Sequence, residues 1–326
     1  MTRVCVVGAG ISGIACARVL REAGVEVEIR ERAHGPGGRM SSPPMSWSSL
    51  GDRRIDTGAA YFTVRDDEFR GVVADWIDRG LAREWTDTFH LLPAADGSPG
   101  LGDTKPGPMR YAAPGGLRSL VVDLAEGLPV RTRTLVDVVD ASSVLPRVDG
   151  DAYDAVVLAM PDPQALTVLG EGLDQERIAL AEQAWLPVLA LQAVFPARSW
   201  PEFDAGFVQD DEVLEIVVDD GRRRGDDAAV LIANSTSPWA APRLEDPDAA
   251  AGPLAEALDR ILGCGRPAET RVSRWTYARP TGSRDENFLF TPRRIGFAGD
   301  GWGSPKIETA WRSGTLLGRR IARELA

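Results

Sequence analysis

The fold is decided by the stretch RVCVVGAGISG, which covers residues 3–13. Mostly apolar residues run into a Gly-x-Gly-x-x-Gly turn, and apolar residues at helical spacing follow. In this pattern Gly8 permits a tight turn, Gly10 lets the backbone approach a diphosphate, and Gly13 lets the helix pack closely on the strand. Free N–H groups and the helix dipole favour an anion at the helix start. The stretch therefore predicts a site for the pyrophosphate of a dinucleotide.

The residues after the turn strengthen this prediction, because a lone glycine motif is a weak signal. Apolar residues recur at helical spacing over 14–20, and Gly24 ends the predicted helix. Alternating residues at 25–30 predict a second strand, and Glu31 stands at its end, where an acid can meet a ribose hydroxyl. Strand, turn, helix, strand and acid together predict a Rossmann-like unit.

The composition limits what else the protein does. The chain has 326 residues, enough for two domains, and its net charge of −11 argues against a nucleic-acid partner and an anionic membrane surface. Three cysteines without close spacing and two histidines give neither a disulfide framework nor a metal motif, so no metal is expected. We find no apolar stretch that could span a membrane and no signal peptide pattern, so a cytoplasmic location is the expectation.

The later part of the chain alternates between two kinds of pattern. The apolar run 155–159, ended by Met160, predicts a buried parallel strand whose carboxyl end lies where ligands bind in such sheets. Glycine and proline at 93–109 predict a loop or hairpin tip, and the charged run 219–227 predicts a solvated hairpin tip. The middle of the chain predicts antiparallel strands at 186–195, 206–209, 213–218 and 229–235.

Four further segments favour FAD over NAD as the cofactor. Small residues at 37–40 let this loop lie along a pyrophosphate and ribityl chain, and Arg39 within it can pair with a phosphate. The turn 56–59 can approach the ring system, and the carboxylate of Asp300 can accept ribityl hydroxyls. The N–H groups of 307–310, which open the last predicted helix, can face the flavin pyrimidine and stabilise charge that gathers there on reduction.

We predict an α/β fold with a discontinuous Rossmann-like FAD-binding domain and a smaller, mostly antiparallel β substrate domain. The first domain is discontinuous because nucleotide-binding character returns near the end of the chain. The predicted FAD-binding domain comprises residues 1–75, 110–162 and 280–326, and the predicted substrate domain comprises 76–109 and 163–279.

These residues also carry a family resemblance: the chain resembles the renalase-like FAD-dependent oxidoreductases, a branch of the flavin amine oxidase superfamily. The matching segments are 37–42, 56–63, 114–116, 160–164, 274–280, 299–300 and 307–314. The resemblance implies non-covalent FAD, a small-molecule substrate and reoxidation by O₂. Bacterial members are similar to enzymes that oxidise isomers of NAD(P)H with the hydride on ring carbon 2 or 6, returning NAD(P)⁺ and giving H₂O₂.

The motif and the resemblance together assign the predicted cofactor-binding residues. They are Gly8, Gly10, Ile11, Ser12, Gly13, Glu31, Arg32, Gly38, Arg39, Met40, Ala59, Ala60, Tyr61, Phe62, Val136, Met160, Gly299, Asp300, Ile307, Glu308 and Ala310. The chain departs from the family pattern at 213–220 and 301–306, two segments expected to border the pocket. These departures leave the identity of the substrate open.

Five residues are candidates for the substrate site, although the flavin itself carries the chemistry. They are Tyr61, Trp275, Tyr277, Trp302 and Lys306. Hydride transfer needs the donor ring held flat and water excluded, which aromatic walls can do without a histidine. Each candidate has a structural alternative: Trp275 and Tyr277 can pack between domains, and Lys306 can act on the flavin through a water, bind a substrate phosphate, or lie exposed.

Two other functions stay open at this point. A flavin amine oxidase or desaturase acting on a small metabolite would share the flavin site and differ only in the pocket. A nucleotide-binding sensor without turnover is the third interpretation, and the helix start at 307–310 argues against it because it suits a reduced flavin.

Overall fold

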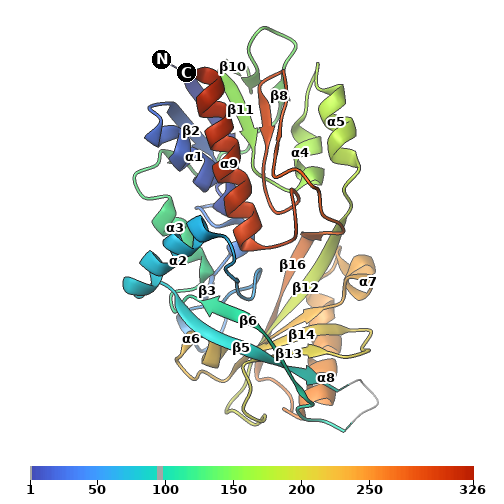
Figure 1. The fold of residues 1–326 in the computed structure, drawn as a ribbon. Coiled ribbons are helices and arrows are strands. Elements are labelled where there is room, and N and C mark those ends of the chain that lie inside the picture. Colours follow the sequence, from blue (N-terminus) through green and yellow to red (C-terminus); the bar gives the residue numbers. More distant parts are fainter. Residues whose placement is uncertain (1, 94–97) are drawn as a thin grey trace.

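The computed structural model describes residues 2–93 and 98–326. Its two main sheets lie in separate halves of the molecule, with α1 and α9 in one half and α8 in the other (Figure 1). Among the described residues, we find no helix that is both long and apolar enough to cross a membrane.

The first sheet has a parallel core. In spatial order its strands are β17 (Leu289–Phe290), β18 (Ile295–Phe297), β11 (Ala155–Leu158), β1 (Arg3–Val7), β2 (Glu26–Arg30) and β7 (Val130–Arg131). β1 runs parallel to both β2 and β11, and β18 runs parallel to β11. Because parallel strands end at the same edge, the segments after β1, β11 and β18 meet at the carboxyl edge of this sheet.

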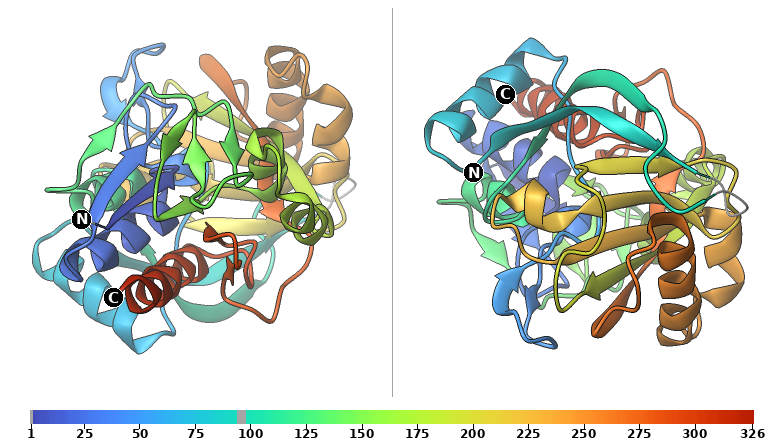
Figure 2. Two further views of the ribbon diagram at one scale, coloured as in Figure 1. Left: turned by 90° about the horizontal axis from the view of Figure 1, so that it is seen from above. Right: turned by 90° about the horizontal axis from the view of Figure 1, so that it is seen from below.

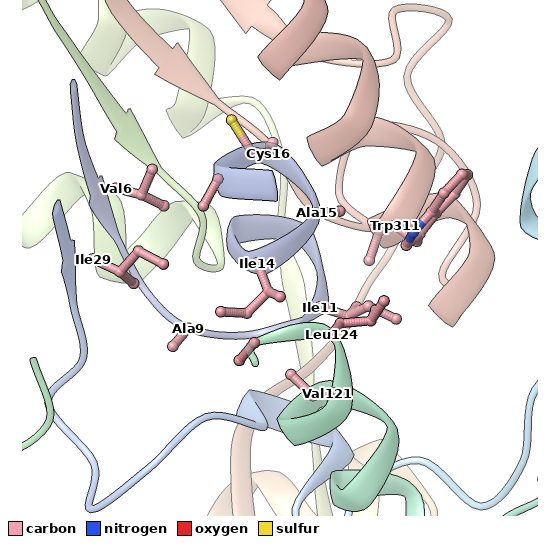
Figure 3. Packing of buried hydrophobic residues seen from close by; sticks show 14 of the residues in the cluster. Val6, Ala9, Ile11, Ile14, Ala15, Cys16, Ile29, Val121, Leu124 and Trp311 are labelled. Carbon is pink, nitrogen blue, oxygen red and sulfur yellow. The ribbon is translucent and has the colours of Figure 1, made fainter. Parts of the chain in front are cut away.

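The helices beside this sheet approach one another closely. A Cβ at Gly314 of α9 (Ile307–Leu325) would lie 1.9 Å from the carbonyl oxygen of Ser12 in α1 (Ile11–Glu22). Only glycine allows this contact between the two helices. Figure 3 shows α1 packing also against α3 (Leu117–Leu124), with Ile14 and Val121 in the shared apolar core. The last helix of the chain thus supports the first helix at its start.

The second sheet is mostly antiparallel. In spatial order its strands are β16 (Glu269–Pro280), β12 (Trp185–Val194), β15 (Val230–Ser235), β14 (Leu214–Asp219), β13 (Ala205–Val208), β5 (Arg83–Leu92) and β6 (Thr104–Ala112). β13 and β5 form the parallel pair within it. The amphipathic helix α8 (Ala251–Leu262) covers one face and buries Leu254, Leu258 and Ile261 (Figure 2).

Shorter elements complete the described chain. The helices are α2 (Asp67–Asp78), α4 (Asp162–Val168), α5 (Asp174–Ala181), α6 (Asp220–Arg224) and α7 (Ser237–Ala240), with 3₁₀ turns at Gly38–Met40, Ala241–Arg243 and Asp248–Ala250. The short strands are β3 (Pro44–Met45), β4 (Gly51–Arg54), β8 (Val139–Asp140), β9 (Arg147–Val148) and β10 (Asp151–Ala152).

The predicted fold class is confirmed, since a Rossmann-like parallel core and a mostly antiparallel sheet are both present. The second sheet has seven strands and the first has six. Its strands at 185–235 lie within two residues of the predicted bounds. The segment predicted as a loop at 93–109 becomes strand β6 from Thr104, and residues 94–97 of it lie outside the described residues. The proposed boundaries between two domains stay predictions.

The segment 219–227 joins the antiparallel strands β14 and β15, as predicted for a hairpin tip, and residues 225–227 are exposed, but the prediction that the rest of it is solvated is wrong. Residues 220–224 form helix α6, and the side chains of Asp220 and Arg223 are almost completely buried. The prediction failed because charged residues are usually exposed, whereas these have oppositely charged partners that lie far away in the sequence.

Candidate functional site

The glycine turn lies between β1 and α1 at the carboxyl edge of the first sheet. Gly8 has φ +104°, and a Cβ there would lie 2.7 Å from the carbonyl oxygen of Ala159. A Cβ at Gly13 would lie 2.1 Å from the carbonyl oxygen of Gly8. At Gly10, by contrast, a Cβ would meet no protein atom within 4 Å. Two of the glycines are thus required by the protein's own packing, and the third borders open space at the helix start.

The start of α1 has the donors that a diphosphate needs. The residue before the helix is Gly10, which has no side chain to cap the free N–H groups. The hydroxyl of Ser12 is buried and has no hydrogen-bond partner among the residues that the structure describes. Open space beside Gly10, uncapped N–H groups and an unpaired hydroxyl together fit the pyrophosphate of FAD.

Glu31 lies where β2 ends, beside the same turn. Its carboxylate accepts hydrogen bonds from the backbone N–H groups of Ala9 and Ala33, each at 2.7 Å. The acid is therefore held next to the glycine turn, as a ribose-binding carboxylate must be. Arg32, also predicted to bind the cofactor, is exposed.

The glycine-rich loop that ends at Met40 packs onto the glycine turn. The N–H of Gly37 donates to the carbonyl of Ala9 at 2.9 Å, and a Cβ at Gly38 would lie 3.2 Å from the Cα of Gly10. From outside, the guanidinium of Arg118 donates to the carbonyl of Pro36 at 2.7 Å. The loop and the turn thus lie side by side.

The structure pairs two of the predicted cofactor residues with each other. Arg39 donates to Asp300 at 2.9 Å and to the carbonyl of Ala278 at 3.0 Å, although Arg39 and Asp300 are 261 residues apart. This ion pair joins the loop to the segment that follows β18. The predicted contact of Arg39 with a phosphate stays a prediction.

The turn 56–59 contacts both the loop and the second sheet. A Cβ at Gly58 would lie 2.0 Å from the carbonyl oxygen of Arg39, and 3.2 Å from the ring of Trp275. The Nε1–H of Trp275, on β16, donates to the carbonyl of Thr57. Trp275 therefore reaches from the second sheet to the turn that was predicted to face the flavin ring.

A buried ion cluster lies under the same turn. Asp56 accepts from the backbone N–H of Leu117 at 2.9 Å and lies 3.2 Å from the guanidinium of Arg224. Arg224 also donates to Asp220 at 3.2 Å, and Arg53 donates to the same carboxylate at 2.6 Å. The three arginines 53, 223 and 224 hold the pKa of Asp220 below its usual range despite its burial.

Asp219, the last residue of β14 and the residue directly before α6, has a pKa shifted in the opposite direction. Asp219 accepts from Trp200 Nε1 at 2.8 Å and from the N–H of Arg222 at 3.0 Å, and it pairs with Arg198. Burial nevertheless raises the pKa of Asp219, because these partners do not fully offset the loss of water.

The other predicted aromatic residues do not form one cluster. Tyr61 packs edge-on against Phe89 with ring centroids 5.4 Å apart, and the guanidinium of Arg110 lies 5.5 Å from its ring. Tyr277 is half-buried on β16. Trp302 is buried beneath the guanidinium of Arg284, at 4.1 Å. Tyr61 and Tyr277 thus lie with the second sheet, whereas Trp302 packs with residues of the first sheet.

The start of α9 is fixed by one carboxylate. Glu308 accepts from the backbone N–H groups of Arg65 and Asp66, at 2.6 and 2.7 Å. Lys306 is the residue directly before the helix, and Ile307 packs against the first core. The N–H of Gly299 donates to Ser313 Oγ at 3.0 Å, which holds the segment after β18 against the same helix.

The remaining predicted cofactor residues are apolar and pack nearby. Ala59 and Met160 are half-buried, and the carbonyl of Ala60 accepts from Arg223 at 2.8 Å. The buried ones are Ile11, Met40, Phe62, Val136 and Ala310.

Sequence reasoning missed Trp185 and Asp162. The guanidinium of Arg39 lies 5.1 Å from the ring of Trp185, and the indole Nε1–H donates to Asp162 at 3.4 Å. Burial raises the pKa of Asp162, and its partner Arg284, at 2.9 Å, opposes this shift. The sequence did contain a signal for Asp162, which lies in the matched segment 160–164, whereas Trp185 lies outside every matched segment.

The described edge of the sheet therefore combines an uncapped helix start with room for a diphosphate, a glycine loop, a carboxylate placed where a ribose hydroxyl is expected, and a second helix start. This set defines a dinucleotide-dependent oxidoreductase with the architecture of the flavin amine oxidases. Residues 6–76 match the model of the NAD(P)-binding Rossmann-like domain.

Comparison with known proteins narrows the class. The chain is 24% identical to renalase of Mus musculus over 310 residues, which cover 87% of this chain and 86% of that protein. Cyclohexylamine oxidase from Brevibacterium oxydans has a similar structure, with a TM-score of 0.76, 16% identity and 99% of each chain covered. Wild-type putrescine oxidase bound to putrescine gives a TM-score of 0.71 at 16% identity, covering 99% of this chain and 98% of that one. The solved structures establish the fold, and the likeness to renalase confirms the predicted class of renalase-like FAD-dependent oxidoreductases.

Proposed function

We propose that this chain oxidises isomeric dihydronicotinamides, the 2- or 6-dihydro forms of NAD(P), to NAD(P)⁺. Bound FAD would supply the two-electron acceptor for the hydride of the dihydropyridine ring, and O₂ with a proton would take up the pair as H₂O₂. The protein's own part is to hold the donor ring flat, to exclude water and to bind the rest of the nucleotide.

The position of Trp275 carries this proposal. Its indole is hydrogen bonded to the carbonyl of Thr57 and lies against Gly58, so an aromatic side chain lies beside the turn that is expected to face the flavin ring system. Both histidines are engaged elsewhere: His34 lies 3.0 Å from Arg118, and His90 lies 3.3 Å from the carbonyl of Gly102. An aromatic wall without a histidine base suits hydride transfer from an electron-rich ring, which needs positioning more than proton transfer.

We also propose that the FAD is held without a covalent bond. The three cysteines are buried, and burial raises the pKa of each thiol to about 12. Cys5 lies within β1 and Cys16 faces the apolar core beneath α1 (Figure 3). Since a thioether to flavin needs an accessible, reactive thiolate, these residues do not suit that bond.

The test is an anaerobic titration of the purified FAD-loaded protein with the 2- and 6-dihydro isomers, following the flavin absorbance, with ordinary NADH as the control. We expect bleaching by at least one isomer and not by NADH, and recovery in air with release of H₂O₂. A flavin that stays oxidised with every isomer would refute the substrate. Trp275→Phe should slow the reduction more than Trp239→Phe, because Trp239, on α7, packs against Arg243 and not against the turn 56–59.

An amine is the alternative substrate, favoured by the amine oxidases among the similar structures. An amine site needs an unpaired carboxylate or an aromatic cage for the cation. The two carboxylates near Trp185 are already paired, Asp162 with Arg284 and Asp300 with Arg39. Reduction of the flavin by cyclohexylamine or putrescine, without reduction by any dihydronicotinamide, would decide for this alternative.

A further inference from the structure

A cleft of about 390 Å³ opens at the start of α9. Its walls come from the segment before α2, the segment before β17, the residues between Asp300 and α9, and the first two turns of α9. This volume is in the lower part of the range of ligand pockets, roughly 300–1,000 Å³. The cleft therefore has room for a part of a dinucleotide and not for the whole of it.

The charges around the cleft are mainly positive. Four cationic side chains line it: Arg65, Arg284, Lys306 and Arg312. Among the described residues, no carboxylate lies within 4.0 Å of the charged group of Arg65 or Lys306, whereas Arg284 is paired with Asp162. Arg312 makes a long contact of 3.7 Å with Asp66.

The two acids of the cleft are occupied by the backbone. Glu308 accepts two N–H groups, as described above, and Asp66 accepts from the N–H groups of Glu68 and Phe69, both at 3.0 Å, where it caps α2. The two negative charges of Glu308 and Asp66 are fewer than the four positive charges that line the cleft. An anion that entered the cleft would meet Arg65 and Lys306 without having to displace an ion pair.

The cleft adjoins the site proposed for the flavin ring. Lys306 directly precedes the helix start that was predicted to face the flavin pyrimidine. Arg284 stacks on the ring of Trp302 in the cleft wall and pairs with Asp162. Asp162 also accepts a hydrogen bond from Trp185, whose ring lies beside Arg39. In a dinucleotide the reacting ring carries a diphosphate through a ribose. With the ring at the flavin, the diphosphate could lie in this cleft.

We propose that this cleft binds the diphosphate of the dinucleotide substrate, with Arg65, Lys306 and Arg312 as its cationic partners. The proposal rests on the proposed function, and it adds a reason for a nucleotide substrate over a small amine. An amine of the size of putrescine or cyclohexylamine carries no anionic group for the cleft to bind.

The experiment compares two electron donors in the FAD-loaded protein: 6-dihydro-NAD, which has the diphosphate, and 6-dihydronicotinamide riboside, which lacks phosphate. The quantity measured is the ratio of their KM values. In the unchanged protein we expect a clearly lower KM for the dinucleotide, and this advantage should shrink about three- to tenfold in the double variant Arg65→Met/Arg312→Met. Added KCl should reduce the same advantage, because salt screens exposed charges.

Arg320→Met is the matched control. Arg320 is an exposed arginine on the same helix, paired with Glu324 near the other end. The control should leave the KM ratio unchanged. An unchanged ratio in the double variant, or an equal change in the control, would overturn the cleft as the diphosphate site.

A second measurement separates the failure of the cleft from the failure of the proposed function. If no dihydronicotinamide reduces the flavin, the proposed function fails, and calorimetric titration of the FAD-loaded protein with inorganic pyrophosphate decides on the cleft alone. Binding that is at least threefold weaker in the double variant than in Arg320→Met supports an anion site. Equal binding in the two variants, or no binding to the unchanged protein, refutes it.

Discussion

The glycine turn at the start of α1 and the charged helix α6 both support the candidate site, but by different means. The turn works through the absence of side chains, since Gly8 and Gly13 let backbone atoms approach where any Cβ would collide. Helix α6 works through a buried cluster of charges, in which Asp220 has no exposed surface and contacts three arginines. The comparison shows that two parts of one candidate site can be held in place differently: the glycine turn by tight backbone packing, and the turn 56–59 by buried ion pairs.

The two regions also differ in what their loss would do. A collision at the turn would push apart β1 and α1, the centre of the first core. A lost charge at Asp220 would leave three arginines sharing fewer carboxylates, Asp56 and Asp226, and this would loosen the turn 56–59 through Asp56 and Ala60. Substitutions in both places test whether these two kinds of support are equally needed.

The largest effect is expected for Gly13→Val. Its Cβ would lie 2.1 Å from the carbonyl oxygen of Gly8, a backbone atom that cannot move without disturbing β1. We expect a loss of more than about 4 kcal/mol in the free energy of unfolding, or no folded protein at all. Urea unfolding followed by circular dichroism measures this loss.

Gly10→Ala is the contrasting variant within the same turn. The added methyl group meets no protein atom within 4 Å, so the fold should survive while FAD is lost, because the methyl group enters the space beside the helix start. Folded protein with a low flavin content would agree with this account. Full flavin content in Gly10→Ala would contradict the assignment of the turn to the pyrophosphate.

The next effect in size is expected for Asp220→Asn. Removing one member of a buried ion pair costs about 3–5 kcal/mol, because its partners stay buried and charged. Asp226→Asn is the matched control, since Asp226 also pairs with Arg53, at 2.7 Å, but has a side chain that is 41% exposed. The control should cost about 0–1 kcal/mol. Equal losses in the two variants would show that burial of the cluster contributes nothing.

The pH dependence of stability checks the same cluster. The folded pKa of Asp220 is below its unfolded value, so its stabilisation is present above the unfolded pKa of about 3.9 and is lost as the pH falls. Asp219 has the opposite sign: its pKa is raised, so its contribution is present at low pH and is lost as the pH rises through the folded value. Between pH 6 and 3 the free energy of unfolding should therefore fall less steeply with pH in Asp220→Asn than in the unchanged protein. Below the unfolded pKa the two slopes should differ by up to about 1.4 kcal/mol per pH unit. An unchanged slope would contradict the shift assigned to Asp220.

The same comparison explains how much of the molecule the sequence predicts. The glycine turn and Glu31 were predicted because the pattern that carries them is local: Gly13 packs against Gly8, and Glu31 accepts from the N–H of Ala9, although Gly8 also packs against the distant Ala159. The burial of Asp220 was not predicted, since its partner Arg53 comes from β4, 167 residues away. Trp185 was missed for the same reason, because only the folded chain brings it to Arg39.

The smallest effect is expected for Ser12→Ala. The hydroxyl of Ser12 is buried at the start of α1 and has no protein partner among the described residues. Gly314 of α9 packs directly against the backbone of Ser12. If it donates to the FAD pyrophosphate, its removal costs one hydrogen bond, about 0.5–1.5 kcal/mol, and raises the Kd of FAD roughly two- to tenfold. The melting temperature of the FAD-free protein should stay the same or rise, because an unpaired buried hydroxyl is removed. Fluorescence titration of the FAD-free protein with FAD measures the Kd, and Ser119→Ala is the control, since that hydroxyl already donates to the carbonyl of Gly116 at 2.8 Å. An unchanged Kd in Ser12→Ala, with a lowered melting temperature, would instead assign the hydroxyl to the stability of α1.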